Sequence, residues 1–209
     1  MKKIHNLILL DESGSMDSIR TSALSAMNET IQTIKMMQKE KNEYEHSVSF
    51  VTFNGNGSEG VKFVRLNVPA EAVKEMTLED YIPGGCTPLY DAIGLSLSAL
   101  EKLVTDEDVV LVSIITDGME NSSHQYSGMQ IKTLIDKQKE KGWTFTYMGA
   151  NQDSKRVAGN IGIVNTLDFE ASDAGVSDMN RKYKRSYMSW CIHDDCMLAS
   201  DCFFEDKDV

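Results

Sequence analysis

Residues 7–16 read Leu7-Ile8-Leu9-Leu10-Asp11-Glu12-Ser13-Gly14-Ser15-Met16, an apolar run that ends abruptly in polar residues. The apolar run predicts a buried strand, and a helical pattern begins directly after the polar residues. In open α/β folds, binding sites lie at the carboxyl ends of central strands, next to the helix that follows. We therefore expect a functional site at the end of this strand.

The polar residues of this stretch have the chemistry of a metal site. Asp11, Ser13 and Ser15 place one carboxylate and two hydroxyl groups on one tight turn. Hard oxygen ligands of this kind suit Mg²⁺ or Mn²⁺ rather than zinc. The alternative interpretation is structural, because Ser13, Ser15 or Asp17 can also cap the following helix without any metal.

Composition limits the class of protein. The chain has 209 residues, of which 41% are hydrophobic, and its net charge is −11. This length suits one α/β domain with a modest extension, and the apolar content is sufficient for a core. The acidic balance argues against nucleic-acid binding, which requires clustered Lys and Arg, and it is compatible with binding a divalent cation.

The amino-terminal residues resemble a signal peptide only superficially. The apolar stretch after Asn6 ends at Leu10 and is too short for the apolar region of a signal peptide. No apolar run reaches the length of a transmembrane helix. We therefore expect a soluble cytoplasmic protein that has no membrane partner, with its four cysteines in the reduced state.

Strand and helix patterns alternate along most of the chain. The continuously apolar runs 4–10 and 109–116 predict two central strands, which we expect to lie side by side. The alternating runs 46–53 and 61–68, joined by a Gly- and Asn-rich loop, predict an antiparallel hairpin with its second strand at a sheet edge. Further strands are expected at 143–148 and 163–169, helices at 16–39, 88–104, 127–141, 153–159 and 172–189, and a short helix and loop at 70–81. This order predicts a doubly wound, Rossmann-like three-layer α/β sandwich whose sheet is mostly parallel.

Two further segments complete a pattern that begins at Asp11. Thr87 lies in Gly-Gly-Cys-Thr-Pro-Leu-Tyr-Asp, before a predicted helix, and Asp117 lies in Ile-Thr-Asp-Gly, at the end of a predicted strand. Together with Asp-x-Ser-x-Ser, these segments resemble the metal-ion-dependent adhesion site (MIDAS) of von Willebrand factor type A (VWA) domains. The resemblance covers roughly residues 1–170. Residues 171–209 are then expected to form a helix and an acidic, cysteine-containing tail packed on the same domain.

The resemblance implies a set of ligands and a mode of binding. In the family, a partner protein supplies a carboxylate that completes the octahedral coordination of the metal. By this resemblance the chain is a binding module and not an enzyme, and its partner is a protein with an acidic residue. Intracellular bacterial members commonly serve AAA+ ATPases or stress-response kinases, and Thr-Asp-Gly-Met-Glu-Asn looks bacterial. The implied ligands of Mg²⁺ or Mn²⁺ are Asp11, Ser13, Ser15, Thr87 and Asp117.

An enzyme is the alternative function. Haloacid-dehalogenase-like phosphatases also carry an aspartate at the end of their first strand, so a metal-dependent hydrolase could use Asp11 as its nucleophile. Those enzymes need a second aspartate two residues later, where this chain has Ser13. A serine hydrolase is less favoured, because neither Ser13 nor Ser15 lies in a Gly-x-Ser-x-Gly turn.

The carboxyl-terminal cysteines offer a second candidate metal site. Cys191, His193, Cys196 and Cys202 are residue types that bind zinc, although their spacing is not that of a standard zinc module. The alternative is a set of reduced thiols that pack against the domain.

Three other side chains lie near the expected site. Met16 and Met119 are expected either in the core or as an apolar rim of the site. Asp91, which follows Tyr90 one turn beyond Thr87, is expected on a polar helix face.

Overall fold

The computed structural model describes residues 2–41, 43–55, 57–192 and 201–204. Within these residues, six strands form one sheet in the order β3-β2-β1-β4-β5-β6. The parallel strands are β1 (Lys2–Asp11), β2 (Tyr44–Phe53), β4 (Val109–Thr116), β5 (Thr144–Ala150) and β6 (Asn165–Phe169). At one edge, β3 (Val61–Pro69) pairs antiparallel to β2. The predicted doubly wound α/β sandwich with one antiparallel edge strand is therefore confirmed.

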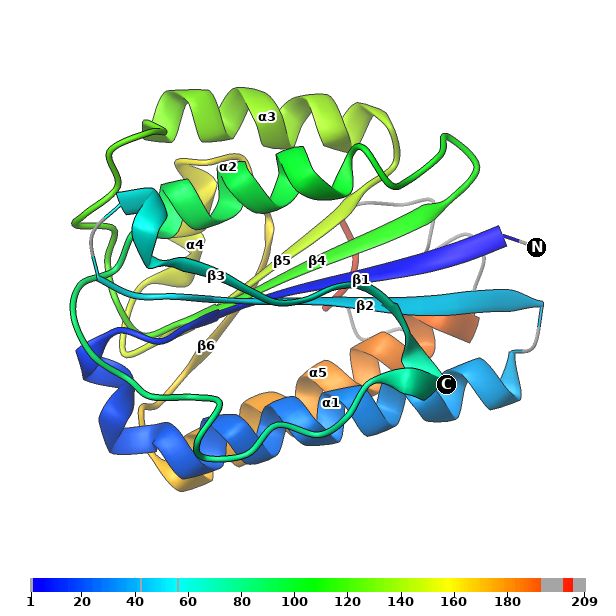
Figure 1. Cartoon of the computed structure of the whole chain (residues 1–209), viewed down its shortest axis with the longest axis horizontal. Helices are drawn as coiled ribbons and strands as arrows, with labels where there is room; N and C mark the ends of the chain where they lie inside the picture. Colours follow the sequence, from blue (N-terminus) through cyan, green and yellow to red (C-terminus); the bar gives the residue numbers. More distant parts are fainter. Residues whose placement is uncertain (1, 42, 56, 193–200, 205–209) are drawn as a thin grey trace.

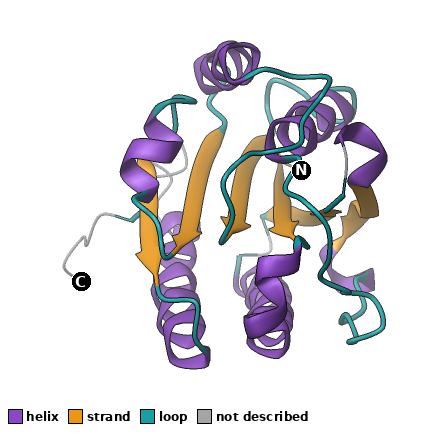
Figure 2. Cartoon of the chain, turned by 90° about the vertical axis from the view of Figure 1, so that its left-hand side faces the viewer, coloured by secondary structure: helices purple, strands orange, loops and turns teal. Residues whose placement is uncertain are grey.

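Helices cover both faces of the sheet (Figures 1 and 2). On one face lie α1 (Arg20–Glu40) and α5 (Asp173–Ile192), and on the other lie α2 (Leu89–Leu100), α3 (Gly128–Glu140) and α4 (Ser154–Gly159). Because successive strand residues point to opposite faces, β1 contributes to both halves of the core. Ile8 and Leu10 pack in the α1–α5 half, and Leu7 and Leu9 pack in the α2–α3 half.

The centre of the sheet brings two strand ends together. β1 pairs in register with β4, so that Leu10 lies opposite Ile115, and the next residues are Asp11 and Thr116. This confirms that the two most apolar strands lie side by side. The carboxyl ends of β1 and β4 therefore lie next to each other at the end of the sheet that is on the left in Figure 1.

The first helical segment begins differently from its prediction. A 3₁₀ helix, η1 (Gly14–Ile19), precedes α1. Ser13 precedes η1 and Ile19 precedes α1, and neither side chain makes a capping hydrogen bond. The interpretation of Ser13, Ser15 or Asp17 as the side-chain cap is therefore wrong. The hydroxyl group of Ser15 instead donates to a distant carboxylate.

The remaining boundaries differ from prediction by a few residues. The helix predicted over 88–104 ends at Leu100, and the residues expected as a short helix and loop contain the 3₁₀ helix η3 (Ala70–Ala72). A further 3₁₀ helix, η2 (Gly57–Gly60), lies in the hairpin between β2 and β3. In the part of the chain that is described, no helix combines the length and the apolar character required to cross a membrane.

Polar as well as apolar contacts join α5 to the sheet. The Tyr187 hydroxyl donates to Asn6 Oδ1 at 2.9 Å, and the hydroxyl groups of Tyr183 and Ser113 lie 2.9 Å apart. Phe203, farther along the chain, is buried and packs against the ring of Tyr183. The helix that follows the last strand is therefore an integral part of the α1–α5 half of the core.

Candidate metal centre

The segments that carry the predicted ligands are hydrogen-bonded to one another at the carboxyl ends of β1 and β4. The Gly14 N–H donates to the Gly85 carbonyl at 3.1 Å, and the Gly84 N–H donates to the Glu12 carbonyl at 2.8 Å. The Asn121 N–H donates to the carbonyl of Thr87 at 3.2 Å. These backbone contacts bring together three segments that lie far apart in the sequence.

Four of the five predicted ligands are joined in one chain of contacts. Ser15 Oγ donates to Asp117 Oδ1 at 2.7 Å and lies 3.3 Å from Ser13 Oγ. The backbone N–H of Ser13 donates to Asp11 Oδ1 at 2.7 Å. A turn after β1 and the end of β4 thus place two carboxylates and two hydroxyl groups within one cluster.

Thr87 joins this cluster beside Gly118. A Cβ atom on Gly118 would lie 2.7 Å from Thr87 Oγ1 and 3.3 Å from Asp11 Oδ2. Any side chain larger than hydrogen at Gly118 would therefore force Thr87 to move, because real Cβ contacts are not so short. The two oxygens face the same small space, so the structure brings all five predicted ligands together.

The cluster has a buried base and an open side. Asp11 is completely buried, Ser13 and Thr87 are buried, Asp117 is half-buried and Ser15 is exposed. Burial raises the pKa of Asp11 to about 6, although hydrogen bonds from Thr116 and Ser13 oppose the shift. Burial also raises the pKa of Asp117, against the hydrogen bond from Ser15. Two close carboxylates in such an environment favour a nearby positive charge.

The donor atoms fit a hard divalent cation. The five side chains supply two carboxylates and three hydroxyl groups, and all of these donors are oxygen. Mg²⁺ and Mn²⁺ prefer such ligands, whereas zinc sites usually contain nitrogen or sulfur. Among the described residues, no group of three or more His, Cys, Asp or Glu side chains could hold a metal. A site here would therefore depend on its hydroxyl groups.

Asp91 has a structural role that sequence reasoning missed. It is completely buried in α2, so its expected place on a polar helix face is wrong. Its carboxylate accepts hydrogen bonds from the backbone N–H groups of His124, Gln125 and Tyr126, at 2.8–2.9 Å. Asp91 therefore anchors the loop that begins with Asp117. An acid within the apolar pattern of α2 is the signal that could have revealed it.

Glu12, Tyr81 and Arg20 hold the loop before Thr87 in place, and their roles were not predicted from the sequence. The Glu12 carboxylate is buried and accepts from the Ile82 N–H at 2.6 Å. The Tyr81 hydroxyl donates to the Asp11 carbonyl at 2.6 Å, and Arg20 Nε donates to the Tyr81 carbonyl at 2.9 Å. The loop is thus attached to both ends of the turn after β1.

The two methionines near the site have different environments. Met16 is completely buried in the α1–α5 half of the core, so it is not part of a rim. Met119 is 66% exposed and follows Gly118 directly. Both follow a predicted ligand segment directly, and the packing of neighbouring elements gives them different environments.

The second candidate metal site falls partly outside the described residues, because His193 and Cys196 lie in the segment 193–200. Cys191 is buried, and its burial raises the pKa of the thiol to about 12. Cys202 is partly buried.

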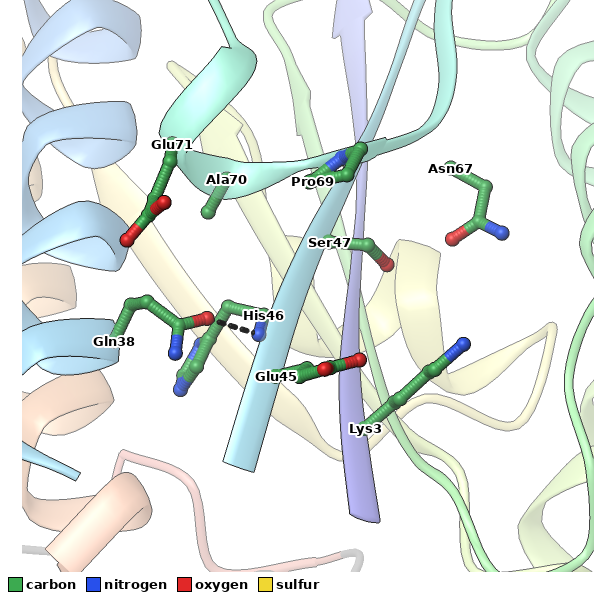
Figure 3. A pocket seen from close by; sticks show the side chains of 9 residues that line it. All are labelled: Lys3, Gln38, Glu45, His46, Ser47, Asn67, Pro69, Ala70 and Glu71. Atoms are coloured by element: carbon green, nitrogen blue, oxygen red, sulfur yellow. Dashed lines mark hydrogen bonds between the residues drawn. The ribbon is translucent and has the colours of Figure 1, made fainter. Parts of the chain in front are cut away.

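A cavity of about 380 Å³ lies at the opposite end of the sheet (Figure 3). It is lined by residues at the start of β1 and β2 and around the end of β3, among them Lys3, His46 and Asn67. At the wall of this cavity, the backbone N–H of His46 donates to Gln38 Oε1. None of the five predicted ligands lines this cavity.

Comparison with known proteins identifies the fold. No family model matches the chain, and no curated protein sequence matches it. Among solved structures, a von Willebrand factor type A protein from Catenulispora acidiphila is 15% identical, with a TM-score of 0.62 over 90% of this chain and 43% of that one. The ArnB paralog VWA2 from Sulfolobus acidocaldarius is 17% identical, with a TM-score of 0.56 over 89% of this chain and 45% of that one.

A third similar structure is proximal thread matrix protein 1 from the mussel byssus, described as having a zinc-occupied MIDAS motif. It is 16% identical, with a TM-score of 0.61 over 86% of this chain and 46% of that one. The chain thus spans less than half the length of each of these three proteins. The shared architecture shows that the chain has the fold of a von Willebrand factor type A domain.

Proposed function

We propose that the chain is a protein-binding module that depends on a divalent metal. Asp11, Ser13, Ser15, Thr87 and Asp117 hold Mg²⁺ or Mn²⁺, and an acidic side chain of a partner protein completes the coordination. The contact of Ser15 with Asp117 carries this proposal, because it joins hydroxyl and carboxylate donors from two distant segments. The zinc-occupied MIDAS motif of the mussel protein supports divalent-metal binding in this fold.

The hydrogen bonds of the site favour metal binding over helix capping. Ser13 stands at the start of η1 and makes no side-chain capping bond, and the residue at the start of α2 is Pro88, whose side chain cannot make one. The Ser15 hydroxyl is directed at a carboxylate, and the Thr87 hydroxyl faces Gly118. Hydroxyl groups that served as helix caps would accept from backbone N–H groups of their own helix.

The surroundings of the site indicate how a partner would be attracted. The loop segments 12–18, 82–87 and 117–123 contain no Lys or Arg. The metal is then the main positive charge available to a partner carboxylate, so binding should be lost completely when the metal is removed. Ile82 is 60% exposed and Met119 is 66% exposed, and these two side chains offer apolar contacts near the open side.

We infer a binding role rather than catalysis. Asp11 is completely buried, and both of its carboxylate oxygens already accept hydrogen bonds. A nucleophilic aspartate must reach its substrate, whereas a ligand at the base of a metal site need not. For the partner, an AAA+ ATPase or a stress-response kinase complex in the bacterial cytoplasm is our specific proposal.

A capture experiment tests this function. The full chain, Asp11→Ala and Asp106→Ala are immobilised and exposed to lysate with Mg²⁺ or with a chelator, and bound proteins are identified. Asp106 is exposed in the loop before β4, at the other end of the sheet. Asp106→Ala therefore removes the same charge as Asp11→Ala, but far from the site. We expect one metal-dependent partner to bind the full chain and Asp106→Ala but not Asp11→Ala. A partner that binds equally with chelator would contradict the proposal.

A further inference from the structure

Thr116, the last residue of β4, connects the two acidic residues of the proposed metal site. It is completely buried, and its Oγ1 lies 2.5 Å from Asp11 Oδ2. The Gly118 N–H lies 3.0 Å from the same hydroxyl oxygen. One side chain thus contacts the carboxylate of Asp11 and the backbone on the far side of Asp117.

The direction of these hydrogen bonds follows from the chemistry of a hydroxyl group. A hydroxyl has one hydrogen to donate and two lone pairs that accept. The Thr116 hydroxyl has two acceptors within reach, Asp11 Oδ2 at 2.5 Å and the Gly118 carbonyl at 3.1 Å. The carboxylate is nearer and charged, so the hydrogen is directed at Asp11 Oδ2. A lone pair of Thr116 Oγ1 then accepts from the Gly118 N–H.

This arrangement restricts the rotation of the Asp11 carboxylate. Oδ1 is held by the backbone N–H of Ser13 at 2.7 Å, and Oδ2 is held by Thr116. With each oxygen held by one donor, the remaining lone pairs have defined directions. Oδ2 shares the space beside Gly118 with Thr87 Oγ1, which is another predicted ligand.

We infer that Thr116 is a positioning residue for the metal site: it orients the Asp11 carboxylate and ties it to the turn that carries Asp117, so that the site is organised before the cation binds. This inference rests on the proposed metal-binding function. Hydrogen bonds to ligating carboxylates commonly tune metal affinity, and their loss weakens binding about 10- to 100-fold.

The chain contains a matched control for a buried strand threonine. Thr144, the first residue of β5, is completely buried, and its hydroxyl has no hydrogen-bond partner among the described residues. Replacing Thr144 with Val therefore removes a buried strand hydroxyl without touching the site. It measures the effect of exchanging a buried hydroxyl for a methyl group, whereas Thr116→Val also removes hydrogen bonds.

The test compares Mg²⁺ and Mn²⁺ dissociation constants of the wild type, Thr116→Val, Thr116→Ser and Thr144→Val by calorimetry, together with their unfolding in chelator. We expect about 10- to 100-fold weaker metal binding for Thr116→Val, and nearly unchanged binding for Thr116→Ser and Thr144→Val. Serine keeps the hydroxyl, so rescue by Thr116→Ser separates the hydrogen bond from the packing of the methyl group.

Two results would overturn the inference. One is unchanged metal affinity in Thr116→Val, and the other is an equal loss in Thr116→Val and Thr116→Ser. If Thr116→Val does not fold, Thr116→Ala is measured in the same way, because the smaller side chain cannot clash. Wild-type metal affinity in Thr116→Ala would also overturn the inference. A wild type that binds neither metal removes the proposed function and this inference together, whereas normal wild-type binding isolates the role of Thr116.

Discussion

Ser15 Oγ lies 2.7 Å from Asp117 Oδ1, although 102 positions separate the two residues in the sequence. The contact exists because β1 and β4 are parallel neighbours whose carboxyl ends coincide. Ser15 follows the first strand and Asp117 follows the fourth, so each is delivered to the same edge of the sheet. The geometry of the proposed metal site is thus a consequence of strand order.

Metal binding should stabilise the protein. At a free Mg²⁺ or Mn²⁺ concentration of about 100 times the dissociation constant, the added stability is about 2.7 kcal/mol. For a chain of this size, this corresponds to an increase in Tm of roughly 5–10 °C. Thermal unfolding monitored by circular dichroism, with metal or with chelator, measures the shift. Asp11→Ala should abolish it and Asp106→Ala should keep it, and a full shift in Asp11→Ala would remove the site assignment.

Gly118→Ala should weaken metal binding with little effect on folding. The added Cβ would lie 2.7 Å from Thr87 Oγ1, so Thr87 must move away from the position shared with Asp11. We expect at least about a tenfold loss in affinity, equivalent to about 1.4 kcal/mol, measured by calorimetry. The control is Gly159→Ala, where a Cβ meets no atom within 4 Å. Equal affinities in the two variants would show that Thr87 is not a ligand.

Asp91→Ala should destabilise the fold strongly. It removes the carboxylate that accepts three part-buried hydrogen bonds, from the backbone N–H groups of His124, Gln125 and Tyr126. A hydrogen bond to a charged group contributes about 1.5–3 kcal/mol, so the loss in the free energy of unfolding should be roughly 3 kcal/mol or more.

Urea denaturation measures this loss, with Asp136→Ala as the control. Asp136 lies on α3 in an exposed ion pair with Lys132, and such pairs contribute about 0.5 kcal/mol or less. A similar small effect in both variants would contradict the anchoring role of Asp91.

His46 should contribute a loss of stability as the pH falls below about 6.5, the ordinary pKa of a histidine side chain, because burial lowers the pKa of His46 to about 4. Between these two values the unfolded chain binds a proton that the folded protein excludes, so protonation favours unfolding. Across the whole interval the loss is roughly 3 kcal/mol. His46 Nδ1 faces the Tyr187 hydroxyl at 3.2 Å, which provides no compensating negative charge.

Urea denaturation at pH 7.5 and pH 4.5 measures this dependence. His5 contributes in the same direction as His46, because burial lowers its pKa despite the nearby Asp108. Asp11 contributes in the opposite direction, because burial raises its pKa to about 6 and the folded protein then holds the proton more tightly. Relative to the wild type, His46→Gln should therefore be more stable at pH 4.5 than at pH 7.5. An unchanged pH dependence in His46→Gln would show that this histidine is not responsible.

No phosphatase activity is expected on generic phosphomonoesters in the presence of Mg²⁺. The Asp11 carboxylate is completely buried and holds hydrogen bonds on both oxygens. Release of p-nitrophenol from p-nitrophenyl phosphate is a sufficient assay. Turnover that disappears in Asp11→Ala would favour the hydrolase alternative.

The periodicity of apolar residues was sufficient to predict the architecture. Continuous apolar runs predicted the central strands β1 and β4, because a strand covered on both faces is apolar throughout. The alternating runs and the loop between them predicted the hairpin of β2 and β3, although β2 is buried on both faces from His46 onward. The residue types Asp11, Ser13 and Ser15 likewise indicated hard-oxygen chemistry, because the donor atoms are fixed by the identity of each side chain.

The roles of individual side chains could not be predicted in this way. Ser15 could equally have capped a helix, Asp91 has the residue type of a surface acid, and Met16 could have formed an apolar rim of the site. Each outcome depends on atoms from other elements: Asp117 at the end of β4, three N–H groups of a distant loop, and the packed α1–α5 half of the core. Apolar pattern is a local property of the chain, whereas a hydrogen-bond partner is defined only when the folded sheet brings remote segments together.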